Sequence, residues 1–558
     1  MTHQPRLLAT LLLGGLGLGL GLLAAPSPAD AFCGFYVAGA DAELFNNATL
    51  VVLMRDGTRT VLSMQNDYQG PPEDFALIIP VPVVLHEGDV KTLPNEVFAR
   101  VDKLAAPRLV EYWEEDPCAP RLEYQKSGVR GGRWLREEED EKSAEQLGVK
   151  IEAQFEVAEY QIVVLSAEDS TGLETWLQQE KYNIPEGAAP ILQPYVQSGM
   201  KFFVAKVDVT KVKFEGGHAT LSPLRFHYDS PEFSLPVRLG LINANGPQDL
   251  LVHILAKNQR YHMANYPNVT IPTNLDVKEI TKEQFGKFYV SLFDHALAQA
   301  PKAVVTEYSW AAGSCDPCPE PALTLEELVT LGADVLPSYV DTIGKSVREQ
   351  TPLDESLTWS VPNEFVLTRL HARYDKDSLG EDLVFAEAPA IVGGREFMQD
   401  DGKLEQGARS DETNNFQARY IIRHPWTGKV ECKDPQYGIW GGPPEGGGNQ
   451  PTVARQLAFE ARDASLATFV TAESGKLIDV VVAEAPPTTP TEPTTPTEPP
   501  ASGDEPKPTQ SKAAAKSESK PEAGKGCACA VEAAPQAAGW SLLGLFGLTS
   551  IRRRRTHA

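Results

Sequence analysis

The sequence predicts an α+β protein of two related units with mostly antiparallel sheet, then a disordered Pro/Thr-rich stalk and one transmembrane helix. Three observations carry this prediction. Short β-branched and apolar runs, separated by turn residues, fill much of the 558-residue chain. Fragments of the first half recur in the second half. Beyond residue 483 proline and threonine predominate, and an apolar segment followed by four arginines ends the chain.

Length and charge narrow the function classes. Without its two ends the chain keeps roughly 450 residues, enough for two or three domains with hydrophobic cores. The net charge is −25. Such an acidic surface repels phosphate, so nucleic acid is not an expected partner.

The first 31 residues have the pattern of a secretory signal peptide. Arg6 precedes an apolar run at residues 7–25, and Ala29 and Ala31 stand three residues and one residue before an expected cleavage site. A retained N-terminal helix is the alternative, but the glycines in the run weaken a permanent helix. We therefore expect export by the secretion machinery.

The C-terminal end has the composition of a stalk followed by a membrane anchor. Residues 484–525 contain PPTTPTEPTTPTEPP, which favours an extended, disordered linker. Residues 533–551 are apolar or small and long enough for one transmembrane helix. The stop after this helix consists of Arg552, Arg553, Arg554 and Arg555. The positive-inside rule places these arginines in the cytoplasm and the folded part outside.

The last 33 residues, 526–558, also resemble a known class of sorting signal. Gly526-Cys527-Ala528-Cys529, an apolar helix, an arginine cluster and the chain end follow one another as in MYXO-CTERM signals. This resemblance implies a dedicated processing protease that cuts near Cys527, modification of that cysteine, and delivery to the cell surface. Without the resemblance, the same segment is a single-pass anchor with two thiols beside the membrane.

The remaining cysteines favour structural disulfides. Export would place Cys33, Cys118, Cys315, Cys318 and Cys432 in an oxidising compartment, where disulfides persist. Five is an odd number, so at least one is free or pairs between chains. We expect a Cys315–Cys318 disulfide and regard Cys33–Cys118 as a plausible second one, although the sequence leaves the connectivity open.

The Cys-x-x-C motif at 315–318 has two other interpretations. A thioredoxin-like redox pair would require a strand-to-helix turn. Here Gly313 and Ser314 precede the motif and Pro319 and Pro321 follow it, which indicates a loop. A zinc site would need a second cysteine pair at suitable spacing, which the sequence lacks.

The folded part divides into two units and an extension. The first unit covers residues 32–245 and includes an acidic, exposed insertion at 119–155. The second covers 246–395, and an irregular extension follows at 396–483. Asp56-Gly57 between two β-rich runs predicts a hairpin in the first unit.

An internal repeat supports this division. Ala-Pro-Arg and Asp-Pro-Cys at residues 106–118 recur as Ala-Pro-Lys and Asp-Pro-Cys at residues 300–318. Residues 173–185 align with 325–337, and Thr171 with Glu174 is expected to cap the first of these helices. Phe203-Val204 corresponds to Phe365-Val366 at the start of a strand.

Several stretches resemble the bacterial family called domain of unknown function 2330. They are CGFYVAGADAELFNNATLVVLMRDGTRTVLSMQNDYQGPPEDFALIIPVPV, VLSAEDSTGLETWLQQEKYNIP, LSPLRFHYDSPEFSLPVRLGLINA and VLTRLHARYDKDSLGEDLVFAEAPAIVGGRE. Together they span most of residues 33–396. The resemblance implies an exported bacterial protein, and it carries over no activity, cofactor or active-site residue.

No familiar constellation of catalytic, cofactor-binding or metal-binding residues is present in the sequence. His253 and His262 are expected to be surface or core residues rather than ligands. Residues 400–403 (DDGK) form one acidic turn without the ligand spacing of a calcium site. We therefore predict no catalytic residue, no cofactor and no metal.

The sequence thus favours a non-enzymatic envelope or surface protein with a binding or structural role, held in the membrane by its C-terminal helix. The alternative is an envelope enzyme. It would be either a thiol-disulfide protein that uses Cys315 and Cys318, or a hydrolase whose site cannot be recognised from one sequence.

Overall fold

The computed structural model describes most of the chain between residues 35 and 483. It leaves undescribed residues 1–34, 38–44, 47–48, 66–67, 70–75, 120–148, 181–187, 216–217, 243–247, 375–379, 398–403, 445, 447–449, 455–461, 480–481 and 484–558. The predicted signal peptide, stalk, transmembrane helix and sorting signal therefore lie outside the described residues. Among the helices that are described, none has both the length and the apolar character needed to cross a membrane.

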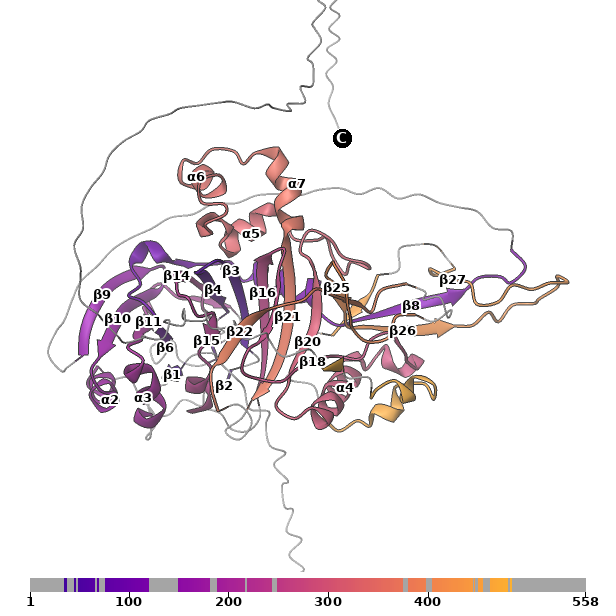
Figure 1. Ribbon diagram of the computed structural model, residues 1–558, viewed down its shortest axis with the longest axis horizontal. Helices are drawn as coiled ribbons and strands as arrows, with labels where there is room; N and C mark the ends of the chain where they lie inside the picture. Colours follow the sequence, from indigo (N-terminus) through magenta and orange to yellow (C-terminus); the bar gives the residue numbers. More distant parts are fainter. Residues whose placement is uncertain are drawn as a thin grey trace, which may run out of the picture. The chain divides into compact units, whose positions relative to one another are not determined.

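A 12-stranded sheet forms the centre of the fold (Figure 1). Along its main path the strands are β24 (Arg409–Ser410), β23 (Ile391–Gly393), β25 (Asn415–Gln417), β20 (Val304–Ala311), β21 (Phe365–Tyr374), β16 (Gln248–Lys257), β3 (Thr49–Asp56), β4 (Arg59–Met64), β14 (Leu224–Asp229) and β7 (Val90–Thr92). Beside β20 lie β18 (Asn268–Thr270) and, next to it, β29 (Val482–Ala483). Most neighbours are antiparallel, so the α+β class with mostly sheet is confirmed.

Strands from both halves of the chain share this sheet. β3 pairs in parallel with β16, with Leu53 opposite Ile254, and β16 pairs with β21 along ten positions. By its internal contacts the chain up to Thr489 forms one compact unit. The predicted boundary after residue 245 thus falls between strands of one continuous sheet.

The hairpin of β3 and β4 illustrates how the large sheet is buried on both of its faces. Asp56 pairs with Arg59 across Gly57, whose φ of 59° suits a residue without a Cβ atom. Successive side chains of a strand point to opposite faces. Val51 and Leu53 join one hydrophobic cluster, whereas Val52 and Met54 join another.

A second sheet covers one face of the large sheet. Its strands, in order, are β1 (Phe35–Val37), β6 (Ala76–Val81), β11 (Lys201–Val207), β10 (Tyr160–Ala167) and β9 (Val149–Val157). The rings of Phe203 and Phe226 stack between the two sheets with centroids 5.3 Å apart. The outer face of this second sheet packs against α2 (Ser170–Gln179) and α3 (Ala189–Gln197).

Part of the predicted acidic insertion belongs to this second sheet. Residues 149–155 were expected to be exposed, but they form most of β9 and pair with β10. The reason is an alternation of apolar residues, because Val149, Ala153 and Phe155 are buried at every second or fourth position. The insertion is therefore shorter than the composition indicated.

Helices cover the other face of the large sheet. They are α1 (Glu96–Ala105), α5 (Leu325–Leu331), α6 (Ile343–Arg348) and α7 (Glu355–Glu364), and α4 (Phe285–Gln299) packs in a separate cluster. The cap predicted at Thr171 is wrong, because Asp169 is the N-cap of α2 and accepts a hydrogen bond from the Gly172 amide at 2.7 Å. The reciprocal cap occurs in α5 instead, between Thr324 and Glu327.

Two long strands form an arm at one side of the fold (Figure 1). β8 (Arg108–Glu114) runs parallel to β26 (Arg419–His424), with Glu111 opposite Ile422. β19 (Leu275–Asp276) lies on the other side of β26, and β27 (Trp440–Gly441) and β28 (Thr452–Val453) pair with β8. Residues more than 300 positions apart in the sequence thus become neighbours.

The order of elements can be compared with the repeat that the sequence predicts. In the first half α1, β8, α2 and β11 occur in this order, with β9, β10 and α3 between them. In the second half α4, β20, α5 and β21 occur in this order, with α6 and α7 between them. The aligned sequence fragments fall on the matched elements, since both Asp-Pro-Cys motifs follow a strand and both Phe-Val pairs begin or lie near the start of one. The repeat itself stays a prediction.

A network of buried charged side chains crosses β16, β20 and β21. Glu307 accepts from Arg369 Nε at 2.7 Å through one carboxylate oxygen and faces His371 Nδ1 at 2.7 Å through the other. His371 Nε2 lies 3.6 Å from Asp249, beyond hydrogen-bonding distance, and Arg373 Nε donates to Asp249 at 2.7 Å. Glu307, Arg369, His371 and Asp249 are all buried.

The charged side chains of this buried network shift each other's pKa. Burial alone would raise the pKa of Glu307, but the positive charges of His371 and Arg369 outweigh it and lower the pKa to about 2. Burial opposes charge on His371 as well, yet the carboxylates of Glu307 and Asp249 raise its pKa above the usual value. Glu307 is therefore ionised at neutral and mildly acidic pH, and His371 keeps its positive charge to a higher pH than an ordinary histidine.

We predict that Glu307→Gln lowers the free energy of unfolding by about 3–5 kcal/mol, because it leaves Arg369 and His371 buried with one less carboxylate. The stabilisation from Glu307 is present above pH 4.5 and is lost as pH falls towards 2. The stabilisation from His371 is complete below pH 6.5 and is lost as pH rises through its raised pKa. Urea unfolding across this pH range should show the largest difference between wild type and variant at about pH 4.5–6.5.

The matched control is Glu349→Gln, which removes an exposed carboxylate 3.9 Å from Lys345. It should change the free energy of unfolding by no more than about 0.5 kcal/mol. Equal effects of the two substitutions would contradict a stabilising role for the buried charged network.

Candidate functional site

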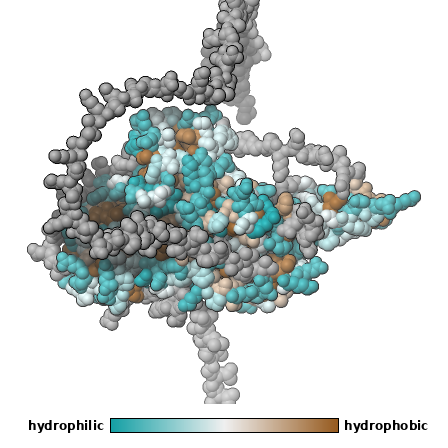
Figure 2. Space-filling view, in the orientation of Figure 1, coloured by the Kyte–Doolittle hydropathy of each residue, from teal (hydrophilic) through white to brown (hydrophobic). Residues whose placement is uncertain are grey.

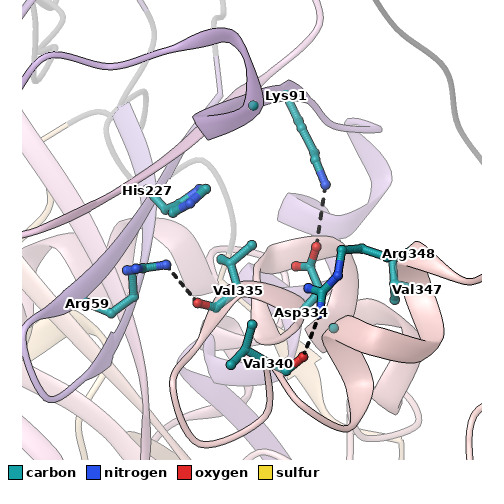
Figure 3. A pocket seen from close by; sticks show the side chains of 10 residues that line it. Arg59, Lys91, His227, Asp334, Val335, Val340, Val347 and Arg348 are labelled. Carbon is teal, nitrogen blue, oxygen red and sulfur yellow. Dashed lines mark hydrogen bonds and ion pairs between the residues drawn. The ribbon is translucent and has the colours of Figure 1, made fainter.

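A cleft of about 290 Å³ lies between one end of the large sheet and the segment that contains α5 and α6 (Figure 3). Arg59 of β4, Lys91 of β7 and His227 of β14 line it from the sheet. The opposite wall comes from the 3₁₀ turn Ala333–Val335, from α6 and from the segment between them. Its lining residues are Asp334, Val335, Val340, Gly344, Val347 and Arg348. A volume of this size suits a small ligand.

Positive charge predominates in this cleft. Arg59 donates to the backbone carbonyl of Val335 at 2.9 Å and pairs with Asp229 at 2.8 Å. Arg348 donates to the backbone carbonyl of Val340 at 3.3 Å, and no carboxylate among the described residues forms an ion pair with it. In a protein of net charge −25, this local surplus of cations sets the cleft apart.

Asp334 is the acidic residue in the wall of the cleft, and two cations share it. Arg225 donates to one of its carboxylate oxygens at 2.8 Å from within the core, and Lys91 lies 3.4 Å from the other. Arg225 also donates to the carbonyls of Val329 and Thr330 at the end of α5. The Arg225–Asp334 pair thereby fixes the turn after α5 against β14.

His227 contributes little positive charge at neutral pH. Burial lowers the pKa of its imidazole, and the neighbouring charges of Arg59 and Arg225 add to this effect. Asp89, whose carboxylate lies 3.4 Å from His227 Nε2, acts in the opposite direction but is outweighed. The charge of the cleft therefore comes from its arginine and lysine side chains.

Gly344 allows α6 to approach the floor of the cleft closely. A Cβ atom at this position would lie 2.2 Å from the backbone oxygen of Asp334 and 3.2 Å from the Arg348 guanidinium. Only glycine fits there without a shift of the backbone. The absence of a side chain at Gly344 thus lets α6 lie close to Asp334, so that Asp334 and Arg348 belong to the same wall.

The sequence alone did not indicate this cleft. Its residues come from segments near positions 59, 91, 227 and 334–348, and each segment is unremarkable in isolation. Only the pairing of β14 with both β4 and β7 brings Arg59, Lys91 and His227 together. A surplus of basic residues at spacings this wide leaves no motif.

Cys315 and Cys318 form a disulfide in a loop that neighbouring side chains hold in place. Arg108 donates to the Pro317 carbonyl at 2.8 Å, and Gln417 donates to the Asp316 carbonyl at 2.6 Å. Both donors are buried. The loop is therefore held by the core beneath it rather than placed at the strand-to-helix turn of a redox site.

The second disulfide corrects the expected connectivity. Cys118 pairs with Cys432, not with Cys33, which lies outside the described residues. The physical reason is the parallel pairing of β8 with β26, which carries the segments after both strands in the same direction. The sequence could not anticipate this pairing, because the two cysteines are 314 positions apart.

The other residues singled out in the sequence divide into two groups. His253 and His262 are buried in β16 and β17 (Arg260–Met263) and belong to the core. Burial, together with the charge of Arg369, holds the pKa of His253 well below its usual value. The DDGK turn, Cys527 and the four arginines after residue 551 lie outside the described residues.

The sequence matches one known protein family. The family model described as an uncharacterized protein conserved in bacteria (DUF2330) matches residues 27–386, which is more than half of the chain. The chain therefore belongs to this bacterial family. No curated protein shows significant similarity to the sequence.

Two solved structures are similar to part of the chain. A mutated baculovirus P35 after caspase cleavage is 12% identical, with 44% of this chain and 70% of that chain covered and a TM-score of 0.20. Baculovirus P35 is 11% identical, with 39% and 66% covered and a TM-score of 0.19. Scores this low carry no argument about the fold or function of this chain.

We predict that the two disulfides differ in what they contribute to stability. The double substitution Cys118→Ser and Cys432→Ser should lower the free energy of unfolding by about 2–4 kcal/mol, because that bridge closes a very long loop. Replacing Cys315 and Cys318 by serine should cost less, because the bridge spans three positions. Urea unfolding without reductant measures both, and the reverse order would contradict the prediction.

Proposed function

We propose that this chain is an exported protein of the bacterial cell envelope, anchored by its C-terminal segment, whose folded part binds a small anionic ligand in the basic cleft. The role is binding rather than catalysis. The observation that carries the proposal is the guanidinium of Arg348, which forms no ion pair with a described carboxylate and which lines, with Arg59 and Lys91, a cleft of an otherwise acidic protein.

The chemistry of the cleft favours an oxyanion such as a phosphate or carboxylate group. Guanidinium and ammonium groups donate charge-assisted hydrogen bonds to such oxygens. Arg348 and Lys91 come from opposite walls, so one small anion between them would join α6 to the sheet (Figure 3). The cleft presents no nucleophile paired with a base, which supports binding over hydrolysis.

The described surface is consistent with recognition through this cleft. On the face that Figure 2 shows, hydrophilic residues predominate over the described surface, and apolar ones are scattered among them. The largest exposed apolar side chains, Val209, Ile280, Trp359, Phe397, Val430 and Tyr437, come from distant parts of the sequence. The polar cleft is therefore the better supported binding feature.

A thiol-disulfide role for Cys315 and Cys318 is the rival function, and it is less well supported. A redox pair needs a thiolate stabilised near a helix N-terminus or a cation. Here the guanidinium of buried Arg108 donates to the backbone carbonyls of Pro317 and Leu104, Gln417 donates to the Asp316 carbonyl, and the disulfide bond is closed. These contacts favour a structural disulfide.

We expect Arg348→Gln to weaken phosphate binding about tenfold, since it removes a charged donor from the cleft. Isothermal titration of the full-length protein with inorganic phosphate and with succinate measures this change and distinguishes the two oxyanion classes. Raising the salt concentration should weaken binding as well. Lys345→Met is the matched control, because Lys345 lies on the same helix but does not line the cleft. Equal losses in both variants, or no binding of either anion, would contradict the proposal.

We expect the native protein to occur in the cell-envelope fraction with its N-terminus at Phe32. Edman sequencing of the purified protein and fractionation of the cells measure these two properties. Replacing Arg552–Arg555 by glutamine should reduce anchoring in the expected orientation, because the positive stop is removed. Cytosolic protein that retains Met1 would contradict export.

A further inference from the structure

A second cluster of ligand-type side chains lies on the β8–β26 arm and the turn beside it. Glu111 comes from β8, His424 ends β26, and Glu279 begins the 3₁₀ turn Glu279–Thr281 after β19. The parallel order β19-β26-β8 brings these three elements side by side. Three segments that are remote in sequence thus converge on one point.

The distances between these side chains are those of groups that could share one ion. His424 Nε2 lies 2.9 Å from Glu111 Oε2, and His424 Nδ1 lies 3.6 Å from Glu279 Oε2. One ligand atom from each residue lies within 4.8 Å of the others. One ion can use only one of the two ring nitrogens of His424. Zinc ligands at about 2.0–2.2 Å from the ion are about 3–4 Å from one another, so the exposed Glu279 carboxylate would rotate towards the nitrogen that faces Glu111.

The imidazole of His424 is held in place, while one carboxylate is free to adjust. The ring of His424 stacks on Trp113 with centroids 4.6 Å apart and an angle of 16°. Glu111 is 15% exposed and His424 is 25% exposed, whereas Glu279 is 66% exposed. Two ligands are therefore largely ordered beforehand, and the third can rotate onto an ion from solvent.

Lys282 is the competitor for such an ion. Its ammonium lies 2.7 Å from Glu111 Oε1, and the oxygen that faces His424 is the other one, Oε2. Two carboxylates and one ammonium surround the imidazole, so carboxylates outnumber the ammonium group at this site. A divalent cation would satisfy the lone pairs that converge there, and two carboxylates with one imidazole form a ligand set that zinc accepts.

We propose that Glu111, Glu279 and His424 bind one divalent transition-metal ion, with Zn²⁺ as the ion that this set favours. The ion would join β8, β26 and the turn after β19. It would therefore cross-link the arm to the rest of the fold, independently of the Cys118–Cys432 disulfide. This inference does not depend on anion binding in the cleft.

Isothermal titration of the full-length protein with ZnCl₂ tests the proposal. The protein should carry no polyhistidine tag, and its free thiols should be alkylated after treatment with EDTA, so that cysteines do not bind the metal. Wild type should bind one equivalent. His424→Ala and Glu279→Gln should each weaken binding about tenfold or more. Glu279 is exposed, so its substitution tests the site even if the His424 variant fails to fold.

Two further variants serve as a control and as a test of the competition. His295→Ala removes another histidine that lies beside a carboxylate, 2.8 Å from Asp479, and should leave zinc affinity unchanged. Lys282→Met should bind zinc at least as tightly as wild type, because the competing ammonium is gone. No binding by wild type, unchanged affinity in Glu279→Gln, or loss of binding in Lys282→Met would overturn the proposal.

Discussion

The ion pair between Glu307 and Arg369 is the interaction on which the large sheet depends. Both side chains are buried, they come from the adjacent strands β20 and β21, and each has a further partner. Arg369 also pairs with Asp102 of α1, and Glu307 with His371. Buried charges are tolerated only where each is matched in this way. The pair consequently fixes which residues of β20 and β21 face each other and where α1 lies.

Further contacts connect this ion pair to both ends of the sheet. His371 stacks on Phe293 of α4 and faces Asp249 of β16, and Arg373 and Arg462 both reach Asp249. Strand β16 then joins the strands of the first half of the polypeptide to the sheet through its parallel pairing with β3. The basic cleft is at the far edge, where β14 and β7 meet the turn after α5. The polar core and the cleft are thus parts of one continuous framework.

Local patterns allowed much of the fold to be predicted. The Asp56-Gly57 turn predicted the hairpin of β3 and β4, because such a turn depends on two residues and their flanks. The α+β class followed from similar short patterns. The buried charges of β20 and β21 could not be predicted, because Glu307, Arg369 and His371 resemble surface residues until their strands pair. Val149, Ala153 and Phe155 were missed because the acidic composition of the preceding segment concealed their alternation.

The candidate sites were harder to predict for the same reason. Cys118 and Cys432, the lining of the cleft, and the Glu111–Glu279–His424 cluster all depend on contacts between distant segments. A single sequence gives residue types but not which strands pair. The Cys315–Cys318 bridge is different, because its two residues are close enough for the spacing to suggest it.

The parallel pairing of β8 with β26 has a consequence for how the chain matures. β8 is synthesised early, but its partner strand is made about three hundred residues later. Contacts of such high sequence separation form slowly, since a long loop must close before they stabilise anything. Until His424 emerges, residues 108–114 have no β26 to pair with, and the arm stays incomplete. A polypeptide built in this way completes the arm only after almost all of its folded part has been synthesised.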